Sequence, residues 1–335
     1  INEPVHHPDH PGAVAYIDTL VAAVRSTGAK QVLFHNLSQD FRIADALRRS
    51  TVQGITFGWY PTGLNSGHEL RGNYLRAVDH YDPMRDSALR HMPRLVYEFD
   101  SADLRTGYMY PAMVRAFRAG GVQLAAMFSY DMLRTASRNL GWQTHYLNLV
   151  YTPRKAMSAV VAAEVMRRVP RGRSYGGYPR NTRFGDFRVS YEENLGELVA
   201  PDAFLHAGST RSSPPDLARL TRIAGVGSSP IVTYEGLGSY FIDKVRDGVW
   251  RLEVYPDAVS VDEPFAPPSP DKVVTRAIDR SWPMRIRLPD LGDAFHVQSV
   301  AAGIPGARRA DRGGFAVRPG VYLLSATAGI DPDSL

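Results

Sequence analysis

The first 170 residues alternate between short apolar runs and longer amphipathic stretches. Apolar residues at helical spacing predict helices over 13–27, after Asp40, after Pro111 and over 153–169. Short apolar runs between them predict strands over 31–35, 54–60, 94–98 and 122–128. A stump that ends at Asn2 is interpreted as one more strand. Strands that alternate with helices at this pitch indicate a parallel sheet.

The pattern changes after Pro170. Residues 171–179 are rich in Gly, Arg and Tyr, and they predict a boundary between a domain over 1–172 and another over 180–330. Beyond this boundary, apolar runs predict strands over 183–191, 203–207, 230–234, 239–245, 249–255, 284–288, 295–300 and 320–324. Asp247-Gly248 is a strong hairpin signal, and 256–270 is predicted to be a proline-rich loop. This half is predicted to be an all-β sandwich.

Composition narrows the classes of function. The 335 residues are 44% hydrophobic and 22% charged, as in globular proteins. The absence of cysteine excludes disulfides, zinc–thiolate sites, iron–sulfur clusters and thiol nucleophiles. No apolar run approaches the roughly 20 residues of a membrane-spanning helix. The net charge is +5, but the cations are mostly scattered arginines, which argues against nucleic-acid binding.

Candidate chemistry gathers at the ends of the predicted strands, where the active sites of parallel α/β barrels lie. Two carboxylates stand there, Glu3 and Glu98, and a pair of carboxylates across a cleft is typical of glycoside hydrolysis. Nearby aromatic residues offer flat faces for sugar rings: Trp59, Tyr60, Phe128, Tyr130 and Trp142. Polar residues that could hydrogen-bond sugar hydroxyls are His35, Asn36, His68 and Glu69.

Several of these residues also have a purely structural interpretation. Glu3 could be a loop carboxylate, and both Trp59 and Trp142 could be ordinary core aromatics. Asp100 and Asp103 are interpreted as caps of the following segment, whereas Asp131 either hydrogen-bonds its loop or contacts substrate. A segment dense in metal ligands consists of His6, His7, Asp9 and His10. Its flanking prolines favour a loop wall of the cleft over a metal site, so no metal or cofactor is predicted.

Asn2-Glu3-Pro4 at one strand end and Tyr97-Glu98-Phe99 at another resemble the clan A retaining glycoside hydrolases. Members of that clan are (β/α)8 barrels with the acid/base glutamate, preceded by Asn, on strand four and the nucleophile on strand seven. The resemblance covers the first domain and implies that these positions lie on successive strands five to eight: His35, Tyr60, Glu98 and Phe128. Two features depart from the clan. Strands one to three, with the Arg that many members carry on strand two, are absent, and strand eight ends in Phe128 rather than Trp.

The resemblance implies an α/β fold, the C-terminal part of a TIM-type barrel followed by the β-sandwich. It also implies retaining hydrolysis of a β-linked glycoside or polysaccharide, with Glu98 as nucleophile and Glu3 as acid/base. Asn2 would hold the sugar 2-hydroxyl, and Tyr60 would hydrogen-bond the nucleophile. The expected partner is a carbohydrate substrate, and the expected location is periplasmic or extracellular. Sugar, linkage and oligomeric state stay open.

Two other functions are retained as hypotheses. One is a non-catalytic carbohydrate-binding or scaffold protein. The other is a metal-dependent hydrolase that uses the cluster of His6, His7 and His10. The chain opens at Ile1 without a signal peptide, and its start resembles a strand end, which suggests a fragment or a processed form. Because five strands cannot close an eight-stranded barrel, we expect this chain to be poorly active and prone to aggregate unless the missing segment is supplied.

Overall fold

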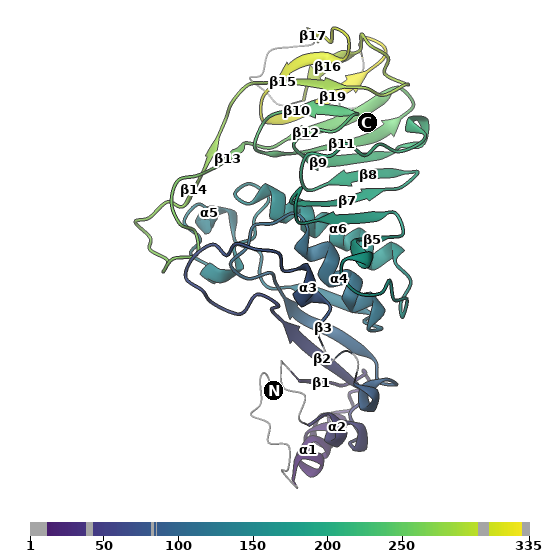
Figure 1. Ribbon diagram of the computed structural model, residues 1–335, viewed down its shortest axis with the longest axis vertical. Coiled ribbons are helices and arrows are strands. Elements are labelled where there is room, and N and C mark those ends of the chain that lie inside the picture. Colours follow the sequence, from purple (N-terminus) through teal and green to yellow (C-terminus); the bar gives the residue numbers. More distant parts are fainter. Residues whose placement is uncertain (1–11, 38–42, 82–83, 85, 301–307, 330–335) are drawn as a thin grey trace.

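The computed structural model describes residues 12–37, 43–81, 84, 86–300 and 308–329. It has mixed α/β architecture. From the bottom to the top of Figure 1, α1 (Ala13–Ser26) and α2 (Ala44–Arg49) are followed by a small parallel sheet and then by the helices α4 (Met109–Ala119) and α6 (Pro153–Arg168). A large sheet follows, and a smaller sheet packs against its upper part. The predicted mixture of a parallel first half and an all-β second half is confirmed at this level.

The parallel sheet has the order β1-β2-β3-β4, which is also the order in the chain. Its strands are β1 (Phe34–Asn36), β2 (Gly54–Trp59), β3 (Arg94–Phe99) and β4 (Leu124–Met127). The other helices of this half are α1 (Ala13–Ser26), α2 (Ala44–Arg49), α3 (Leu75–Val78) and α5 (Leu133–Ala136). Within the described residues the sheet is open, and β1 and β4 form its two edges.

Helix ends follow local chemistry. Thr152 is the N-cap of α6 and Pro153 its first residue, as predicted, because proline at this position loses no hydrogen bond. The helix α4 begins at Met109, two residues before the predicted start at Pro111, since the first turn of a helix tolerates proline. It ends at Gly120, and Gly121 turns the chain with φ +82°. Asp40, the predicted cap of the second helix, lies outside the described residues.

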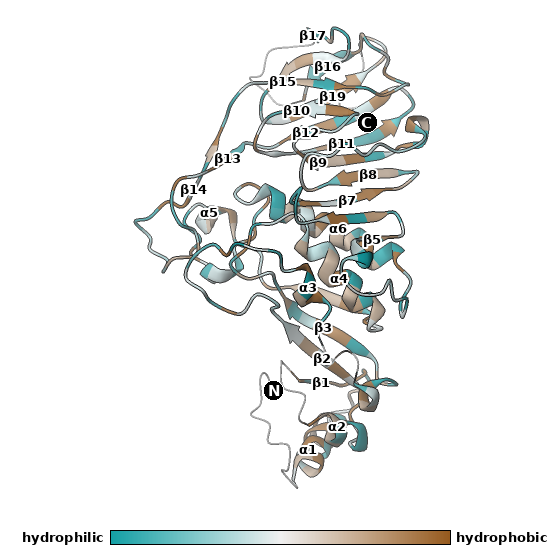
Figure 2. Ribbon diagram, in the orientation of Figure 1, coloured by the Kyte–Doolittle hydropathy of each residue, from teal (hydrophilic) through white to brown (hydrophobic). Residues whose placement is uncertain are grey.

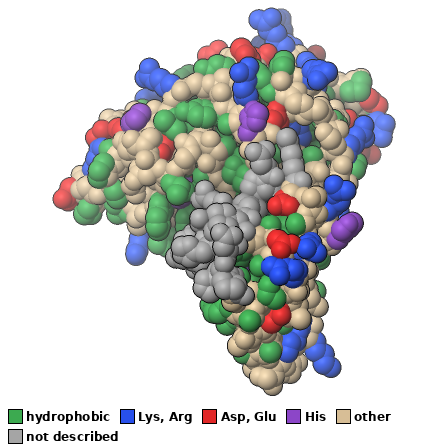
Figure 3. Space-filling view, turned by 60° about the horizontal axis from the view of Figure 1, so that its bottom comes forward, with side chains coloured by type: hydrophobic (Ala, Val, Ile, Leu, Met, Phe, Trp, Pro, Cys, Tyr) green, Lys and Arg blue, Asp and Glu red, His purple; other side chains and the backbone are tan. Residues whose placement is uncertain are grey.

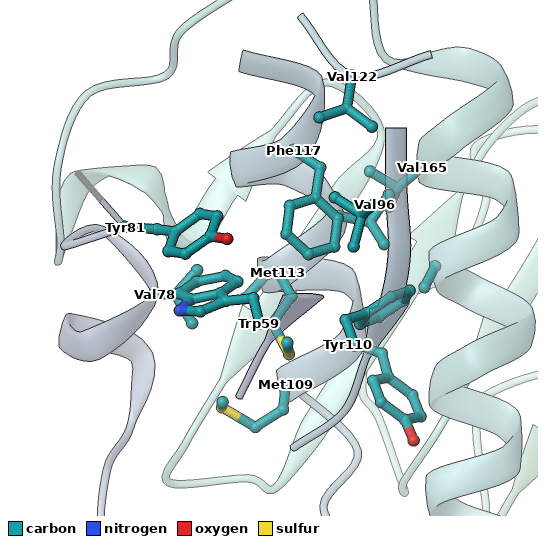
Figure 4. Packing of buried hydrophobic residues seen from close by; sticks show 14 of the residues in the cluster. Trp59, Val78, Tyr81, Val96, Met109, Tyr110, Met113, Phe117, Val122 and Val165 are labelled. Atoms are coloured by element: carbon teal, nitrogen blue, oxygen red, sulfur yellow. The ribbon is translucent and has the colours of Figure 1, made fainter. Parts of the chain in front are cut away.

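The core beneath the parallel sheet is formed by side chains of β2, β3, α4 and α6 (Figure 4). Every second residue of β2 enters it: Ile55, Phe57 and Trp59. Phe99 of β3 and Phe117 of α4 pack edge to face, with the ring centroids 5.0 Å apart. This contact helps to pack β3 against α4. The exposed edge is less well covered, because Leu124 and Met127 of β4 are 54% and 37% exposed.

The large sheet has ten strands, in the order β17-β16-β19-β12-β11-β9-β8-β7-β6-β5. Its strands are β5 (Arg183–Phe184), β6 (Phe187–Ser190), β7 (Leu195–Val199), β8 (Ala203–His206), β9 (Arg222–Val226), β11 (Ser239–Arg246), β12 (Val249–Val254), β16 (His296–Ser299), β17 (Arg308–Arg309) and β19 (Gly320–Ser325). Neighbours are antiparallel except β8 and β9. Figure 2 shows both hydrophobic and hydrophilic residues along these strands, and the residues of β8 are buried throughout.

Two smaller sheets complete this half. One contains β10 (Val232–Tyr234), β15 (Trp282–Ile286) and β18 (Gly314–Val317), and the other pairs β13 (Asp257–Ser260) with β14 (Thr275–Ile278). The three-stranded sheet shares a core with β11, β12 and β19, so this part is a sandwich as predicted. The other end of the large sheet packs on α4 and α6 and joins the core of the first half. A single core therefore crosses the predicted boundary at 171–179.

Local predictions in the second half had mixed outcomes. The hairpin at Asp247-Gly248 is confirmed, since it joins β11 to β12. The single strand over 183–191 is wrong: Gly185 adopts φ +59° and turns the chain between β5 and β6. The loop over 256–270 is partly wrong, because its first residues form β13. Strands β7 and β9 were not predicted at all; each contains a glycine, which weakens a strand pattern.

Gly196 lies where β7 meets the segment before α4. A Cβ at this position would collide with the Gly107 carbonyl oxygen and lie 3.0 Å from Pro111 Cγ. The Gly107 N–H also donates to Asn194 Oδ1 at 2.8 Å, so the backbone there is held. We expect Gly196→Ala to lower the free energy of unfolding by about 1–3 kcal/mol. Urea denaturation measures this. Gly177→Ala is the control, because a Cβ there meets nothing within 4 Å, and an equal loss in both variants would contradict the packing argument.

Candidate active site

A β-bulge decides where Glu98 points. Val96 of β3 pairs with Phe57, but the next residue paired across from Gly58 is Glu98, because the register shifts there. Val96 therefore stays on the core side, whereas both Tyr97 and Glu98 lie beside Gly58 on the opposite face. A regular strand would place Tyr97 and Glu98 on different faces. The bulge thus aims the Glu98 carboxylate away from the core at the carboxyl end of the strand.

Gly58 leaves the space that the Glu98 side chain occupies. A Cβ at Gly58 would lie 3.1 Å from Glu98 Oε1 and 3.4 Å from the Tyr97 ring. Both distances are closer than side chains usually approach a Cβ. A glycine in a strand interior often marks a place where another group must come close, and here that group is the carboxylate.

Tyr60 follows β2 and hydrogen-bonds Glu98 through its side chain. Its side chain is buried, and burial together with the negative charge of Glu98 raises the pKa of the Tyr60 hydroxyl. The hydroxyl therefore stays protonated and donates a hydrogen bond to the Glu98 carboxylate. Tyr60 and Glu98 therefore lie together at the carboxyl ends of neighbouring strands, and the catalytic role of the pair stays a prediction.

Asn36 ends β1 on the same face of the sheet. Its Oδ1 accepts a hydrogen bond of 3.1 Å from Thr56 Oγ1, and Thr56 is its neighbour in β2. This contact orients the Asn36 amide, and the role of Asn36 in binding substrate stays a prediction.

Aromatic rings extend outward from the Tyr60–Glu98 pair. The ring of His145 lies 5.0 Å from that of Tyr60 and 5.0 Å from that of Phe128, measured between centroids. Phe128 in turn meets the edge of Trp142 at 6.1 Å, and Trp142 is 61% exposed. The exposed indole beside the half-buried Phe128 ring offers a flat apolar face, as sugar-binding sites do.

A buried charged cluster lies behind these rings. Asp100 Oδ1 is 2.9 Å from Lys155 Nζ and accepts a hydrogen bond of 2.5 Å from the Tyr110 hydroxyl, and neither Asp100 nor Lys155 has exposed side-chain area. His145 Nδ1 lies 2.9 Å from Asp100 Oδ2. Burial opposes ionisation of Asp100, but the Lys155 ammonium and the hydrogen bonds from His145 and Tyr110 outweigh it. They hold the pKa of the Asp100 carboxyl below its usual range.

Other aspartates in this region organise loops. Asp131 is buried, accepts the Leu147 N–H at 2.9 Å, and has its pKa raised by burial to about 6. It therefore takes the loop role rather than the substrate role. Asp103 joins two loops by accepting hydrogen bonds from Ser66 and Thr144. The interpretation of Asp100 and Asp103 as caps was wrong in detail, because the side chains of both reach across to other segments.

Three of the predicted binding residues do not belong with Glu98. Trp59 points into the core because alternate residues of a strand face the same side, and Ile55 and Phe57 are core residues. Its ring stacks on that of Tyr81, with the ring centroids 4.5 Å apart (Figure 4). His35 is in register with Ile55 and so lies on the core side of β1. Glu69 is engaged by Arg105 through two hydrogen bonds. We withdraw all three from the site.

Two further residues are exposed and make local contacts only. The His68 ring lies 3.0 Å from the Ser66 carbonyl oxygen. Tyr130 is 60% exposed, and its hydroxyl accepts the Leu149 N–H. Neither contacts Glu98, so their roles stay predictions. Asn2, Glu3 and the histidines of the 6–10 segment lie outside the described residues, and within those residues there is no group of metal-ligating side chains.

Two large hollows lie away from Glu98. One, of about 680 Å³, opens at the amino ends of β3 and β4 and is lined by charged residues such as Asp86 and Arg171. The other, of about 630 Å³, lies between the start of α6 and the second half of the chain and contains the Glu69–Arg105 pair. Parallel sheets bind ligands at their carboxyl ends. We therefore place the candidate site at Glu98 rather than in either hollow.

Comparison with known proteins found no similarity: no protein-family model matches the chain, and no curated protein is significantly similar to it. Among the described helices, none is long and apolar enough to cross a lipid bilayer. On the face shown in Figure 3, Lys and Arg side chains are scattered among acidic ones instead of forming a stripe.

Sequence reasoning missed His145 and Lys155. His145 ends a short 3-10 helix, η3 (Gln143–His145), in the loop after β4, and Lys155 lies in the first turn of α6. The signal for Lys155 was available, since it is one of few lysines in an arginine-rich chain and lies among apolar residues of a helix. His145 had none, because only the folded loop brings it to Asp100.

Proposed function

We propose that this protein hydrolyses β-linked glycosides with retention of configuration, and that Glu98 is the nucleophile. The placement of Glu98 carries the proposal: the bulge turns it away from the core, and the Tyr60 hydroxyl hydrogen-bonds it. A carboxylate that a neutral donor holds at a strand end keeps its negative charge and can act as a nucleophile. The resemblance of the sequence to clan A retaining glycoside hydrolases supports the same role.

The proposed reaction is a double displacement. One Glu98 oxygen attacks the anomeric carbon, the bond to the leaving oxygen breaks, and that oxygen takes a proton from the acid/base group. Water then attacks the same carbon, gives its proton to the same group, and releases Glu98 as a carboxylate. Two inversions give retention. Glu3 as acid/base and Asn2 as the holder of the 2-hydroxyl rest on the sequence resemblance alone.

We also propose that β1 to β4 correspond to strands five to eight of a (β/α)8 barrel. Three observations support this: the strands are parallel, their order in the sheet equals their order in the chain, and residues of α1, α2, α4 and α6 share one core with β2 and β3. Asn36, Phe128 and Trp142 stay in the proposed substrate site.

An assay on a panel of aryl β-glycosides tests the function. We expect hydrolysis of at least one member, with the β-anomer as the first product seen by proton NMR. A folded protein that hydrolyses none of them, or that releases the α-anomer first, contradicts the proposal. Oligosaccharide binding without hydrolysis favours the carbohydrate-binding hypothesis. Loss of activity in chelator, with return in zinc, favours the metal-dependent one.

Tyr60→Phe removes the hydrogen bond to Glu98 and leaves the ring in place. Hydrogen bonds to charged groups contribute about 1.5–3 kcal/mol, so we expect kcat to fall about 10- to 100-fold with a smaller change in KM. Steady-state kinetics on the best panel substrate measures this. Tyr16→Phe is the control, because Tyr16 is 51% exposed on α1. Unchanged kinetics of Tyr60→Phe would refute the role of Tyr60.

A further inference from the structure

His145 stands between the proposed nucleophile and the exposed aromatic surface. Its ring packs against Tyr60 on one side and Phe128 on the other, and Tyr60 hydrogen-bonds Glu98. The Tyr60 ring therefore lies between His145 and the Glu98 carboxylate. No part of the proposed mechanism uses it so far.

The buried cluster fixes one nitrogen of this ring. Asp100 is ionised and can only accept, so His145 Nδ1 carries the proton of their 2.9 Å contact. The Tyr110 hydroxyl donates to Asp100 Oδ1 at 2.5 Å, and Lys155 Nζ contacts both oxygens, at 2.9 Å from Oδ1 and 3.0 Å from Oδ2. The tautomer and the orientation of the imidazole are thus set by groups that lie wholly inside the protein. Nε2, the other ring nitrogen, is left for a second hydrogen bond.

Nε2 has no partner within the described residues. It makes no hydrogen bond there, and it is not one of the fully buried polar atoms without a partner. The nitrogen therefore reaches the surface of the site, although the residue as a whole is only 3% exposed.

A second buried histidine of the same chain shows what a purely structural role looks like. His206 hydrogen-bonds through both nitrogens, with Gly208 O at 2.8 Å and the Tyr240 hydroxyl at 2.9 Å. Burial lowers the pKa of His206 to about 4, which keeps it neutral. A histidine that serves packing alone satisfies both nitrogens in this way. In His145, by contrast, Nδ1 contacts Asp100, whereas Nε2 makes no hydrogen bond within the described residues.

We propose that His145 binds the substrate directly, with Nε2 hydrogen-bonded to a sugar hydroxyl next to the anomeric carbon that Glu98 attacks. This inference rests on the proposed function and adds a binding residue to it. Phe128 and Tyr60 contact the His145 ring and would limit where the sugar hydroxyl can lie. The Asp100–Lys155 pair positions the His145 ring. The ligand is a polyhydroxyl compound, because a hydroxyl can both donate and accept and therefore suits a single ring nitrogen beside aromatic rings.

The test combines His145→Gln with a series of mono-deoxy aryl glycosides derived from the best panel substrate. We expect kcat/KM of His145→Gln to fall about 10- to 100-fold on the parent glycoside, as for a lost hydrogen bond in a buried site. On one deoxy analogue, which lacks the contacted hydroxyl, the variant and the unmodified protein should be equally slow. A structural defect would lower activity on every analogue by the same factor. An equal loss on all analogues, or no loss on the parent, overturns the proposal.

His206→Gln is the matched control, since it also replaces a buried histidine and lies in the large sheet. We expect it to lower thermal stability but to leave kcat/KM unchanged. If no glycoside is hydrolysed, the proposed function fails. Nitrogen-15 NMR of the imidazoles then still tests whether His145 binds a sugar. The inference then requires the Nε2 resonance assigned to His145 to shift when an oligosaccharide is added. A resonance that stays unmoved at saturating sugar overturns it.

Discussion

Glu98→Gln is expected to lower kcat/KM on an aryl β-glycoside by at least about 1,000-fold, because an amide cannot attack the anomeric carbon. The change is nearly isosteric, and glutamine can still accept the Tyr60 hydrogen bond, so the fold should be retained. Stopped assays with a sensitive aryl leaving group cover this range. Circular dichroism verifies that the variant is folded.

The matched control is Glu235→Gln, which alters an exposed glutamate in the loop between β10 and β11. It should have the kinetics of the unmodified protein. If Glu98→Gln is as active as the unmodified protein, the assignment of the nucleophile is wrong, whatever the substrate. If both variants lose activity equally, the loss does not come from the chemistry of Glu98.

Lys155→Met is expected to give the largest loss of stability, about 3–5 kcal/mol in the free energy of unfolding. Lys155 Nζ and Asp100 Oδ1 are 2.9 Å apart with no exposed side-chain area. Removing the ammonium leaves a buried carboxylate whose remaining partners are the hydroxyl of Tyr110 and the ring of His145. Guanidinium denaturation at neutral pH measures the loss.

Two further variants separate the buried charge from side-chain packing. The double variant Asp100→Asn/Lys155→Met removes both charges and should regain at least about half of the loss. Lys272→Met breaks the partly exposed contact with Asp262 and should cost less than about 1 kcal/mol. A double variant less stable than Lys155→Met would show that packing, and not the unpaired charge, dominates.

The sequence was a good guide to the elements of the first half. Helical spacing predicted a helix over 13–27, and α1 spans Ala13–Ser26. The cap-then-proline signal at Thr152-Pro153 located the start of α6. The meeting of Tyr60 with Glu98 was predicted as well, because polar residues that end neighbouring parallel strands come to one edge of the sheet.

The failures have physical reasons. Trp59 was assigned to the substrate site because it ends a strand. Its two-residue spacing from Ile55 and Phe57 already placed its side chain on the core side of that strand. The bulge that aims Glu98 depends on pairing between strands and leaves no mark in the composition of β3. His145 reaches the site through the fold of a loop, and loops carry no periodicity. Glu69 was predicted without its partner Arg105, which is distant along the chain.

The central claim is that Glu98 forms a covalent bond to the sugar, and trapping that bond tests it most directly. A 2-deoxy-2-fluoro aryl glycoside of the best panel sugar slows the second displacement more than the first, so the intermediate should accumulate. We expect intact-mass spectrometry to show one fluoroglycosyl group per chain and peptide mapping to place it on Glu98. Glu98→Gln should remain unlabelled. A label on any other residue, or no label on a protein that hydrolyses the parent glycoside, would contradict the account.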